Sequence, residues 1–554
     1  MTNRSIMIQG TGSHVGKSIL VCALCRILKQ DGYRVAPFKA QNMALNSFVT
    51  KDGREIGRAQ ATQAEAAGIE PMIEMNPILL KPTGDCGSQV VLMGKPIGNM
   101  TAREYYQKKG EFVSVIQEAY QTLKTRFDII VIEGAGSPAE INLKDGDIVN
   151  MGMAAMASAP VLLVTDIDRG GAFAWIVGTL ELLTESERNR VAGVIFNKFR
   201  GDKNILKPGL DMLEERIRKP IVGVIPYLHQ LNIDDEDSVS LECQGDNDSN
   251  TFRNDFAEQP GLNQIQNRDQ GAGGRGQNTG SEYLTIDTRS RRPFIDIVVI
   301  KLPRISNFTD FNIFTYEKDV RVRFVDKAEN IGKPDLLIIP GTKNTIGDLV
   351  FLNKKGISGE IVKSAKQGVM VVGICGGYQM LGRQINDPYH VESSKTSAPG
   401  LGLLDTVTTF ARGKQTYQVK ASMLEHRCLF HTNDELAGYE IHMGETTYNG
   451  HTSVRPFARI TERAGKTVNI LDGCVSADGN VIGTYIHGIF DNDEFRSKLL
   501  NYLRSKKGLK PFPGYQVDSK NMKEYRYDEL AEIIRRNMNM DMVYAILRKE
   551  HRLG

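Results

Sequence analysis

Short runs of aliphatic and β-branched residues alternate with longer amphipathic segments from the N-terminus to about residue 230. Within each run the apolar residues are nearly continuous, which is typical of strands buried on both faces. Six runs are predicted as strands, at residues 5–10, 33–39, 127–134, 159–166, 191–198 and 220–226. Because helical segments separate these runs, we expect an α/β fold with a parallel sheet covered by helices on both faces.

The strand pattern resumes in the second half of the chain, at residues 294–303, 334–341, 368–375 and 479–488. Residues 400–460, which lie between the last two runs, are rich in Gly, Thr and Tyr and predict further strands and turns. Near the C-terminus, apolar residues recur at helical spacing and predict a packed terminal helix. These residues are Leu530, Ile533, Ile534, Met538, Met542 and Ile546.

Residues 242–292 differ from both halves, because they are rich in Asn, Gln, Gly and Asp and nearly lack aliphatic side chains. Such a stretch cannot bury enough apolar surface to offset its ordering entropy, so we predict a mostly disordered linker or insertion. The expected organisation is a first domain at 1–235, a linker at 236–292, a second domain at 293–505 and a helical extension at 506–554.

The chain has 554 residues, which is too long for one hydrophobic core and supports at least two domains. Its formal net charge of +3 gives no argument for nucleic acid or a membrane surface, and we expect neither as a partner. The seven cysteines show no disulfide-like spacing, and no apolar run resembles a signal peptide or a membrane helix. We therefore expect a cytoplasmic protein, whose oligomeric state, a homo-oligomer included, stays open.

A glycine-rich turn, "IQGTGSHVGKS" at residues 8–18, joins the first predicted strand to a helix. Backbone N–H groups of such a turn favour phosphate at the helix N-terminus, while the lysine contacts the terminal phosphates and the serine binds Mg²⁺. The predicted ATP site comprises Gly10, Thr11, Gly12, Gly16, Lys17 and Ser18. The spacing from Gly10 to Gly16 is one residue longer than usual and resembles the dethiobiotin synthetase branch of P-loop proteins.

Acidic residues follow other predicted strands and are expected to face the same crevice, because the ends of parallel strands meet at one sheet edge. Glu133 ends the strand at 127–134 and is predicted to hold Mg²⁺ opposite Ser18. Asp147 and Asp166 are further candidates for phosphoryl transfer or substrate binding. A helix cap is the alternative for both.

Three strands of the second half end in segments that carry chemistry: "IIPGTKNT", "GICGGYQM" with Cys375, and "GTYIHGIFD" with His487. We expect these strand ends to bring Cys375 and His487 together. A histidine beside a thiol lowers the pKa of the thiol and creates a nucleophilic thiolate. The N–H groups of Gly341 and Gly376 are predicted to bind an oxyanion.

This constellation resembles the class I, triad-type glutamine amidotransferases. The resemblance implies that Cys375 attacks the side-chain amide of glutamine, that ammonia leaves, and that water releases glutamate. The usual third member of the triad is a Glu two residues after the His, and this position is Ile489 here. The third member therefore stays open, with Glu440 and Glu445 as candidates that lack positional support.

Several long segments resemble the cobyric acid synthase family of cobalamin biosynthesis. They are residues 37–47, 53–71, 76–96, 133–143, 308–312 and 340–345, together with the C-terminal segment. The resemblance implies an N-terminal P-loop amide synthase domain, similar to dethiobiotin synthetase, and a C-terminal class I glutamine amidotransferase domain. It also implies ATP- and glutamine-dependent amidation of the b, d, e and g carboxylates of adenosylcobyrinic acid a,c-diamide, which gives adenosylcobyric acid.

The cofactors implied are ATP and Mg²⁺, with glutamine as nitrogen donor, a corrinoid as substrate and no tightly bound prosthetic group. Polar residues after the second strand suit recognition of carboxylates and amides, although loop hydrogen bonding is the alternative. They are Lys39, Gln41, Asn42 and Asn46. Two other functions are weighed: a cobyrinic acid a,c-diamide synthase, which amidates two carboxylates, and a non-enzymatic partitioning-type ATPase. The order of amidation, the ammonia route and the purpose of the linker stay open.

Overall fold

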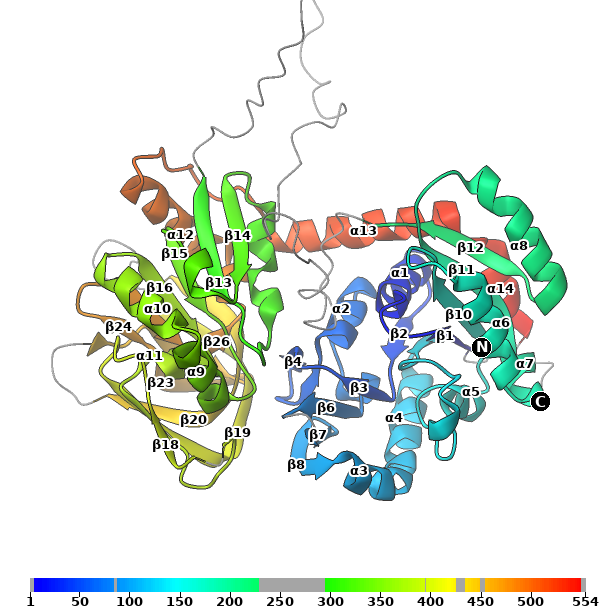
Figure 1. Ribbon diagram of the computed structural model, residues 1–554, viewed down its shortest axis with the longest axis horizontal. Helices are drawn as coiled ribbons and strands as arrows, with labels where there is room; N and C mark the ends of the chain where they lie inside the picture. The colour runs from blue at the N-terminus through cyan, green and yellow to red at the C-terminus, as the bar shows by residue number, and fades with distance from the viewer. Residues whose placement is uncertain are drawn as a thin grey trace, which may run out of the picture.

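The computed structural model describes residues 4–83, 87–228, 294–393, 395–424, 434–448 and 454–549. Two α/β domains lie side by side, and helix α13 (Ser519–Asn537) starts at the edge of the C-terminal domain and runs over the N-terminal one (Figure 1). The linker predicted at residues 242–292 lies outside the described residues. Among the helices that the structure describes, none has both the length and the apolar character needed to cross a membrane.

The first domain is built on a six-stranded parallel sheet in the order β12-β11-β10-β1-β9-β2. These are the six strands that the hydrophobic pattern predicts, so the prediction of a parallel sheet is confirmed. Their bounds are β1 Arg4–Gly10, β2 Val35–Phe38, β9 Ile129–Glu133, β10 Val161–Asp166, β11 Val191–Phe199 and β12 Ile221–Pro226.

Helices cover both faces of this sheet. Successive side chains along a strand therefore point into two different hydrophobic clusters. Ile6 and Ile8 of β1 pack in the cluster that includes α1, whereas Met7 packs in the cluster that includes α4. The bounds of the helices are α1 Lys17–Gln30, α2 Arg58–Ala66, α4 Phe112–Arg126, α5 Met151–Ala157, α6 Ala172–Leu182, α7 Glu185–Arg190 and α8 Lys203–Ile217. The continuous apolar runs are thus explained by burial on both sides.

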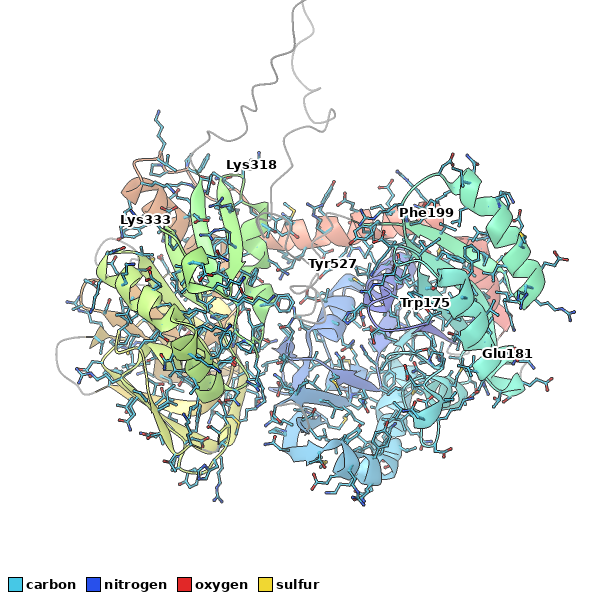
Figure 2. The ribbon with its side chains drawn as sticks, in the orientation of Figure 1. Trp175, Glu181, Phe199, Lys318, Lys333 and Tyr527 are labelled. Atoms are coloured by element: carbon cyan, nitrogen blue, oxygen red, sulfur yellow. The ribbon has the colours of Figure 1, made fainter. Side chains whose placement is uncertain are left out.

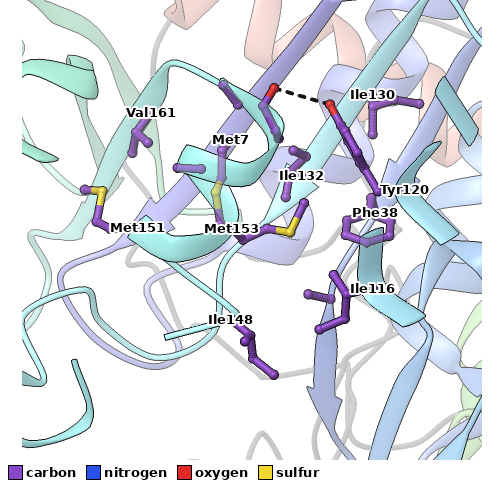
Figure 3. Close-up of a cluster of buried hydrophobic side chains, with 14 of the residues drawn as sticks. Met7, Phe38, Ile116, Tyr120, Ile130, Ile132, Ile148, Met151, Met153 and Val161 are labelled. Carbon is purple, nitrogen blue, oxygen red and sulfur yellow. Dashed lines mark hydrogen bonds between the residues drawn. The ribbon is translucent and has the colours of Figure 1, made fainter. Parts of the chain in front are cut away.

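Figure 3 shows the core on the α4 side, where Met7 and Phe38 are fully buried. Tyr120 of α4 lies edge-on to Phe38, with ring centroids 5.6 Å apart. The Tyr120 hydroxyl hydrogen-bonds to Ser5 Oγ at 2.5 Å. The two buried hydroxyls therefore satisfy each other, as buried polar groups generally must.

A smaller region that the sequence pattern does not predict follows β2. It holds a four-stranded sheet in the order β3-β6-β7-β8, a hairpin of β4 and β5, and helix α3. The bounds are β3 Gln41–Met43, β4 Ser47–Val49, β5 Glu55–Gly57, β6 Ile78–Pro82, β7 Gly87–Leu92, β8 Lys95–Thr101 and α3 Ala102–Lys108. Strands of three residues are too short to show a periodicity, which explains why β3, β4 and β5 are missed.

The second domain contains a seven-stranded sheet in the order β14-β13-β15-β16-β25-β24-β21. The bounds are β13 Ile295–Ile300, β14 Val320–Val325, β15 Leu336–Ile339, β16 Met370–Ile374, β21 Val454–Arg455, β24 Cys474–Ser476 and β25 Val481–Thr484. The helices are α9 Thr345–Lys354, α10 Ile357–Lys366, α11 Gly376–Leu381 and α12 Asp493–Lys506. The four predicted strands are confirmed, whereas β14 is missed because Arg321 and Arg323 interrupt its apolar pattern.

The described parts of residues 400–460 are mostly strands, as the composition of this region predicts. The long strands β19 and β20 pair antiparallel in a sheet of order β18-β17-β19-β20-β26, and β22 and β23 extend it from β19. The bounds are β17 Gln384–Asn386, β18 Ser397–Pro399, β19 Thr406–Met423, β20 Glu435–Tyr448, β22 Ala458–Arg463, β23 Lys466–Asp472 and β26 Ile486–His487.

The C-terminal apolar pattern forms two helices rather than the one predicted, α13 and α14 (Met540–Lys549). Between them Met538 has an extended backbone and bridges to Gly223 of β12. The helical period of the side chains continues across this break, and periodicity alone therefore does not reveal it.

Helix α13 connects the two domains through contacts along its length. At its start, the Ser519 hydroxyl accepts a hydrogen bond of 3.0 Å from Arg496 of α12. Further along, Tyr527, labelled in Figure 2, donates to Glu65 of α2 at 3.0 Å. Arg26 of α1 forms ion pairs with two acidic residues of α13. The helix thus links the two domains.

The domains also meet through a buried ionic cluster. Glu55 of β5 lies between Lys81 of β6, at 2.7 Å, and Lys414 of β19, at 2.5 Å. Burial disfavours the charged carboxylate, yet the two lysines hold the pKa of Glu55 far below its usual range. Burial lowers the pKa of Lys81 to about 8, although Glu55 opposes this change. One carboxylate of the first domain therefore compensates a lysine from each domain.

Candidate active sites

The first site surrounds the glycine-rich turn between β1 and α1, and we call it the phosphate-loop site. Gly16 has φ 95°, a left-handed conformation that glycine adopts without strain, and α1 begins at the next residue. The ammonium of Lys17 donates to the carbonyl oxygens of Gly12 at 3.0 Å and Gly136 at 3.1 Å. The loop thus wraps around the Lys17 side chain, which lies where a phosphate-binding lysine is expected.

Glu133, at the end of β9, is the centre of a buried network beside this loop. The Ser18 hydroxyl donates to Glu133 Oε1 at 2.8 Å, and Lys39 Nζ donates to the same oxygen at 2.9 Å. Gln63 of α2 donates to the other carboxylate oxygen, Oε2, at 2.6 Å. The predicted approach of Ser18 and Glu133 is therefore observed, and Lys39 supplies a positive charge on the carboxylate.

The hydroxyl and carboxylate oxygens of Ser18 and Glu133 form a donor set that suits Mg²⁺, which takes one or two protein oxygens together with substrate phosphates. Within the described residues, no group of three or more His, Cys, Asp or Glu side chains could hold a metal ion. A magnesium ion at this place would therefore depend on the nucleotide for most of its ligands.

Asp147 and Asp166 have local partners. The Asp147 carboxylate accepts from the backbone N–H groups of Val149, Asn150 and Gly152 at the start of α5, which corresponds to the helix-cap alternative. Asp166, at the end of β10, forms an ion pair of 2.8 Å with Lys198. Within the described part of the chain, neither carboxylate forms a hydrogen bond or ion pair with Glu133.

The polar residues after β2 lie in and beside the small sheet. Gln41 accepts from the Tyr105 hydroxyl at 2.5 Å, and Asn42 donates to Gln60 of α2 at 2.9 Å. The Asn46 carbonyl oxygen accepts from the Arg58 N–H at 3.2 Å. Lys39 therefore contacts Glu133, Asn42 and Asn46 contact α2, and Gln41 contacts α3.

Three buried glutamines were not among the predicted site residues. Gln9 precedes the loop, and Gln60 and Gln63 lie on α2. Each keeps one side-chain amide atom without a hydrogen-bond partner in the described part of the chain: Gln9 Oε1, Gln60 Nε2 and Gln63 Oε1. The sequence signal was present, because two glutamines at i and i+3 within the alanine-rich segment "AQATQAEAA" are unusual for a buried helix face.

The second site, which we call the cysteine site, lies at the end of β16. Cys375 has φ 53° and ψ −110° and precedes α11, so the chain turns sharply from strand to helix at this residue. A side chain at Gly376 would place its Cβ 2.8 Å from Thr342 Cγ2, which explains the glycine after the cysteine. The thiol lies 3.5 Å from the Ile441 carbonyl oxygen. Such a turn with φ above zero on a non-glycine residue indicates a functional constraint.

His487, on β26, completes the predicted pair, and an unpredicted residue holds it. Nδ1 of His487 lies 2.7 Å from Asp310 Oδ2, and both side chains are buried. Burial disfavours the charged ring, yet Asp310 and then Cys375 raise the pKa of His487 to about 10. Nε2 of His487 makes no hydrogen bond within the described residues. The three side chains thus form a Cys–His–Asp arrangement.

Asp310 belongs to η6 (Phe308–Tyr316) and is 177 residues away from His487 in sequence. Of the two candidates considered for this position, Glu440 instead pairs with Arg463 at 2.7 Å. Glu445 is exposed on β20. The sequence signal for Asp310 is the segment "FTDFN" at residues 308–312. This segment resembles the family, but the resemblance alone does not indicate a role for the aspartate.

Gly341 follows β15 and lies next to the histidine, because a Cβ added there would be 3.0 Å from His487 Cε1. The ring of Tyr439 stacks on the imidazole, with centroids 5.2 Å apart and an interplanar angle of 14°. Gly376 opens α11 beside Cys375. The predicted oxyanion donors are therefore close to the thiol and imidazole.

Comparison with known families agrees with this division into two sites. Residues 6–241 match the model of the CobQ/CobB/MinD/ParA nucleotide binding domain, and residues 296–495 match the CobB/CobQ-like glutamine amidotransferase domain. The chain therefore carries an N-terminal P-loop domain and a C-terminal amidotransferase domain, as the sequence predicts.

Whole-length relatives are similar along nearly the entire chain. A cobyric acid synthase of Alkaliphilus metalliredigens (strain QYMF) is 49% identical over 547 residues, which is 98% of this chain and 100% of the relative. Those of Thermoanaerobacter sp. (strain X514) and Clostridium tetani (strain Massachusetts / E88) are each 50% identical, over 98% of this chain and 99% and 98% of their own lengths.

Proposed function

The chain belongs to the cobyric acid synthase family of glutamine-dependent amidotransferases in cobalamin biosynthesis, and we propose its substrate and the roles of its residues. The substrate is adenosylcobyrinic acid a,c-diamide, and the b, d, e and g carboxylates become amides to give adenosylcobyric acid. Each amidation consumes one ATP and one glutamine. We call residues 6–241 the synthetase domain and residues 296–495 the glutaminase domain.

In the synthetase domain, a substrate carboxylate oxygen attacks the γ-phosphorus of ATP, ADP leaves, and an acyl phosphate forms. Lys17 and the loop N–H groups stabilise the phosphoryl charge, so positioning and electrostatics do most of the work. Ser18 and Glu133 would hold Mg²⁺, which neutralises phosphate charge when bound. Lys39, Gln41, Asn42 and Asn46 are proposed to contact the corrinoid, together with the amides of Gln60 and Gln63.

In the glutaminase domain, the charged His487 ring carries the proton that the Cys375 thiol gives up, and the thiolate attacks the side-chain carbonyl carbon of glutamine. The N–H groups of Gly341 and Gly376 stabilise the oxyanion. His487 returns the proton to the leaving ammonia, and water then hydrolyses the thioester to glutamate. Asp310 orients the imidazole and stabilises its charged form. Ammonia finally attacks the acyl phosphate and displaces phosphate.

The single observation that carries this proposal is the Cys375–His487–Asp310 arrangement of the second domain, in which Cys375 and His487 lie at strand ends. A partitioning-type ATPase has no use for such a nucleophile. The proposal therefore stands or falls with the dependence of glutamine use on Cys375.

The test is mass spectrometry of the product formed from adenosylcobyrinic acid a,c-diamide, ATP and Mg²⁺, with glutamine or ammonium chloride as nitrogen donor. Four successive decreases of about one mass unit are expected for the wild type with either donor. Cys375→Ala is expected to give the same series with ammonium and none with glutamine. Cys474→Ala, which alters another buried cysteine of the same domain, is the matched control and should retain both.

The outcomes separate the alternatives. Adenosylcobyrinic acid is assayed as a second substrate, and two decreases from it, with no reaction of the a,c-diamide, would identify an a,c-diamide synthase instead. No change in the mass of either corrinoid with either donor would contradict the corrinoid assignment. Retention of glutamine use by Cys375→Ala would contradict the role of the thiol.

A further inference from the structure

The synthetase domain contacts the glutaminase domain beside the catalytic histidine. β4 of the synthetase domain packs against β20, where Val49, Tyr439 and Ile441 form a buried apolar cluster with Phe48 against it. The Phe48 ring meets the Tyr439 ring edge-on, with centroids 5.3 Å apart and an interplanar angle of 60°. This geometry is favourable for aromatic pairs, so the contact fixes the tilt of the Tyr439 ring.

The same Tyr439 ring stacks on His487, and the two residues are direct partners in the β20–β26 pairing. The Tyr439 ring therefore touches Phe48 of one domain and the catalytic imidazole of the other. Its hydroxyl also points to the synthetase domain, where the Ser47 carbonyl oxygen lies 3.4 Å away. The rotation of the imidazole, which decides whether Nε2 faces Cys375, is thus set on one side by a ring that the synthetase domain holds.

Ser47 also touches the segment that carries Asp310. The Ser47 N–H donates to Asn307 Oδ1 at 3.0 Å, and the Asn307 carbonyl oxygen accepts from the Asp310 N–H at 3.0 Å. Asn307 is buried and has a left-handed backbone, φ 53°, at the start of η6. Two adjacent residues of the synthetase domain, Ser47 and Phe48, therefore contact Tyr439 directly, and Ser47 is linked to Asp310 through Asn307.

Phe48 is also linked to the phosphate-loop site, through helix α2. The Arg58 guanidinium lies over the Phe48 ring, 5.2 Å from its centroid. Arg58 begins α2, and Gln63 of the same helix donates to Glu133. A movement of α2 that accompanies binding at Glu133 would therefore reach Phe48 through one rigid helix and one ring contact.

From these contacts we propose that Tyr439 is a positioning residue for His487, and that Ser47 and Phe48 adjust it according to the occupancy of the synthetase site. The inference rests on the proposed function, because it assigns a regulator to the proposed glutaminase. The two sites are then coupled through a contiguous set of packed groups, whose arrangement changes when either site binds its ligand. Glutamine is then hydrolysed fastest when ATP and the corrinoid are bound.

The test measures glutamine hydrolysis with and without ATP, Mg²⁺ and adenosylcobyrinic acid a,c-diamide, together with amidation driven by ammonium chloride. The variants are Phe48→Leu, Tyr439→Leu and the conservative Tyr439→Phe. Phe324→Leu is the matched control, because it removes one ring of an edge-on pair inside the glutaminase domain, 6.4 Å from Phe311.

We expect ligands to stimulate hydrolysis by the wild type, and Phe48→Leu to lower this stimulation by about tenfold, with basal hydrolysis and ammonium-driven amidation retained. Tyr439→Leu should lose the stimulation and also change the pH profile of glutamine hydrolysis, because the imidazole loses its stacking partner. Tyr439→Phe keeps the ring and should restore the profile and most of the stimulation. Phe324→Leu should behave as the wild type.

Several results would overturn the inference. They are equal stimulation in Phe48→Leu and the wild type, a wild type that ligands do not stimulate, and a parallel loss of ammonium-driven amidation in both leucine variants. None of them affects the proposed function, which depends on Cys375→Ala. Conversely, hydrolysis that does not depend on Cys375 would contradict the proposed function before the coupling is measured.

Discussion

The two active sites differ in how completely their groups are arranged for reaction. At the phosphate-loop site, Lys17 is bonded to backbone carbonyl oxygens, and Ser18 and Lys39 both donate to Glu133. A nucleotide and its metal ion must replace these internal bonds. At the cysteine site, Asp310 already holds His487, and the nitrogen that faces the reaction has no hydrogen bond among the described residues.

The difference follows from the charge of the ligands. ATP is highly charged, so a site built for it carries cations that need other partners, and buried charges without partners are costly. Glutamine has an uncharged side-chain amide, and the groups that attack it balance each other within the protein. A site that is arranged in advance must be regulated from outside its three residues, whereas a site that its ligand rearranges is regulated by the ligand itself.

The sharpest way to break the comparison is to disarrange the cysteine site without touching its nucleophile. Asp310→Asn removes the charge that raises the pKa of His487, and we expect glutamine-dependent turnover to fall about 10³- to 10⁴-fold. The pKa of His487 should move from about 10 toward 6.5, because burial then acts without the opposing carboxylate. Glutaminase kinetics across pH check this, and amidation from ammonium should persist. Equal loss with both donors would refute it.

Lys17→Ala tests the other site. We expect amidation to fall about 10³-fold with glutamine and with ammonium alike, because the phosphoryl charge loses its stabilising cation. Basal glutamine hydrolysis should remain, since the cysteine site does not use this lysine. Lys29→Ala, at the other end of α1, is the control and should leave both rates unchanged. Preserved ammonium-driven amidation in Lys17→Ala would show that the loop does not serve phosphoryl transfer.

Glu55→Gln tests whether the two sites are held together by the buried cluster between the domains. Removing the carboxylate leaves Lys81 and Lys414 facing each other in a buried place, which we expect to destabilise the protein by about 3–5 kcal/mol. Urea unfolding measures the loss. Glu462→Gln breaks the exposed pair with Lys420 and should cost only about 0–1 kcal/mol. Similar midpoints for the two variants would count against the cluster.

The smallest effect concerns the support below the cysteine site. Burial raises the pKa of Asp472 from 3.8 to about 6, although hydrogen bonds from Thr484 and Tyr485 oppose this change. Between these pH values the folded chain binds more protons than the unfolded chain, so the free energy of unfolding should fall as pH rises through the window. Asp472→Asn should remove a slope of up to about 1.4 kcal/mol per pH unit. Urea unfolding from pH 4 to pH 6 measures it, and an unchanged slope would contradict it.

The sequence predicts the features that depend on local pattern. Nearly continuous apolar runs predict the parallel strands, and the strand-end positions of Cys375 and His487 predict that the two side chains lie in one site. Asp310 escaped, because its contact with His487 joins distant segments and its own segment has no strand pattern. Lys39 was expected to bind substrate, and its ion pair with Glu133 depends on two strands meeting, which no local signal reports.

The position of α13 in the sequence, after both domains that it links, affects the order in which the protein assembles. The ribosome releases α13 and α14 after the two catalytic domains, which can by then have begun to fold as units. The contacts of α13 between the domains therefore form after both domains are made, when α13 docks on α1 and Met538 joins the edge of the first sheet. A nascent chain that stops before Ser519 contains every proposed catalytic residue and lacks the element that clamps the two domains together.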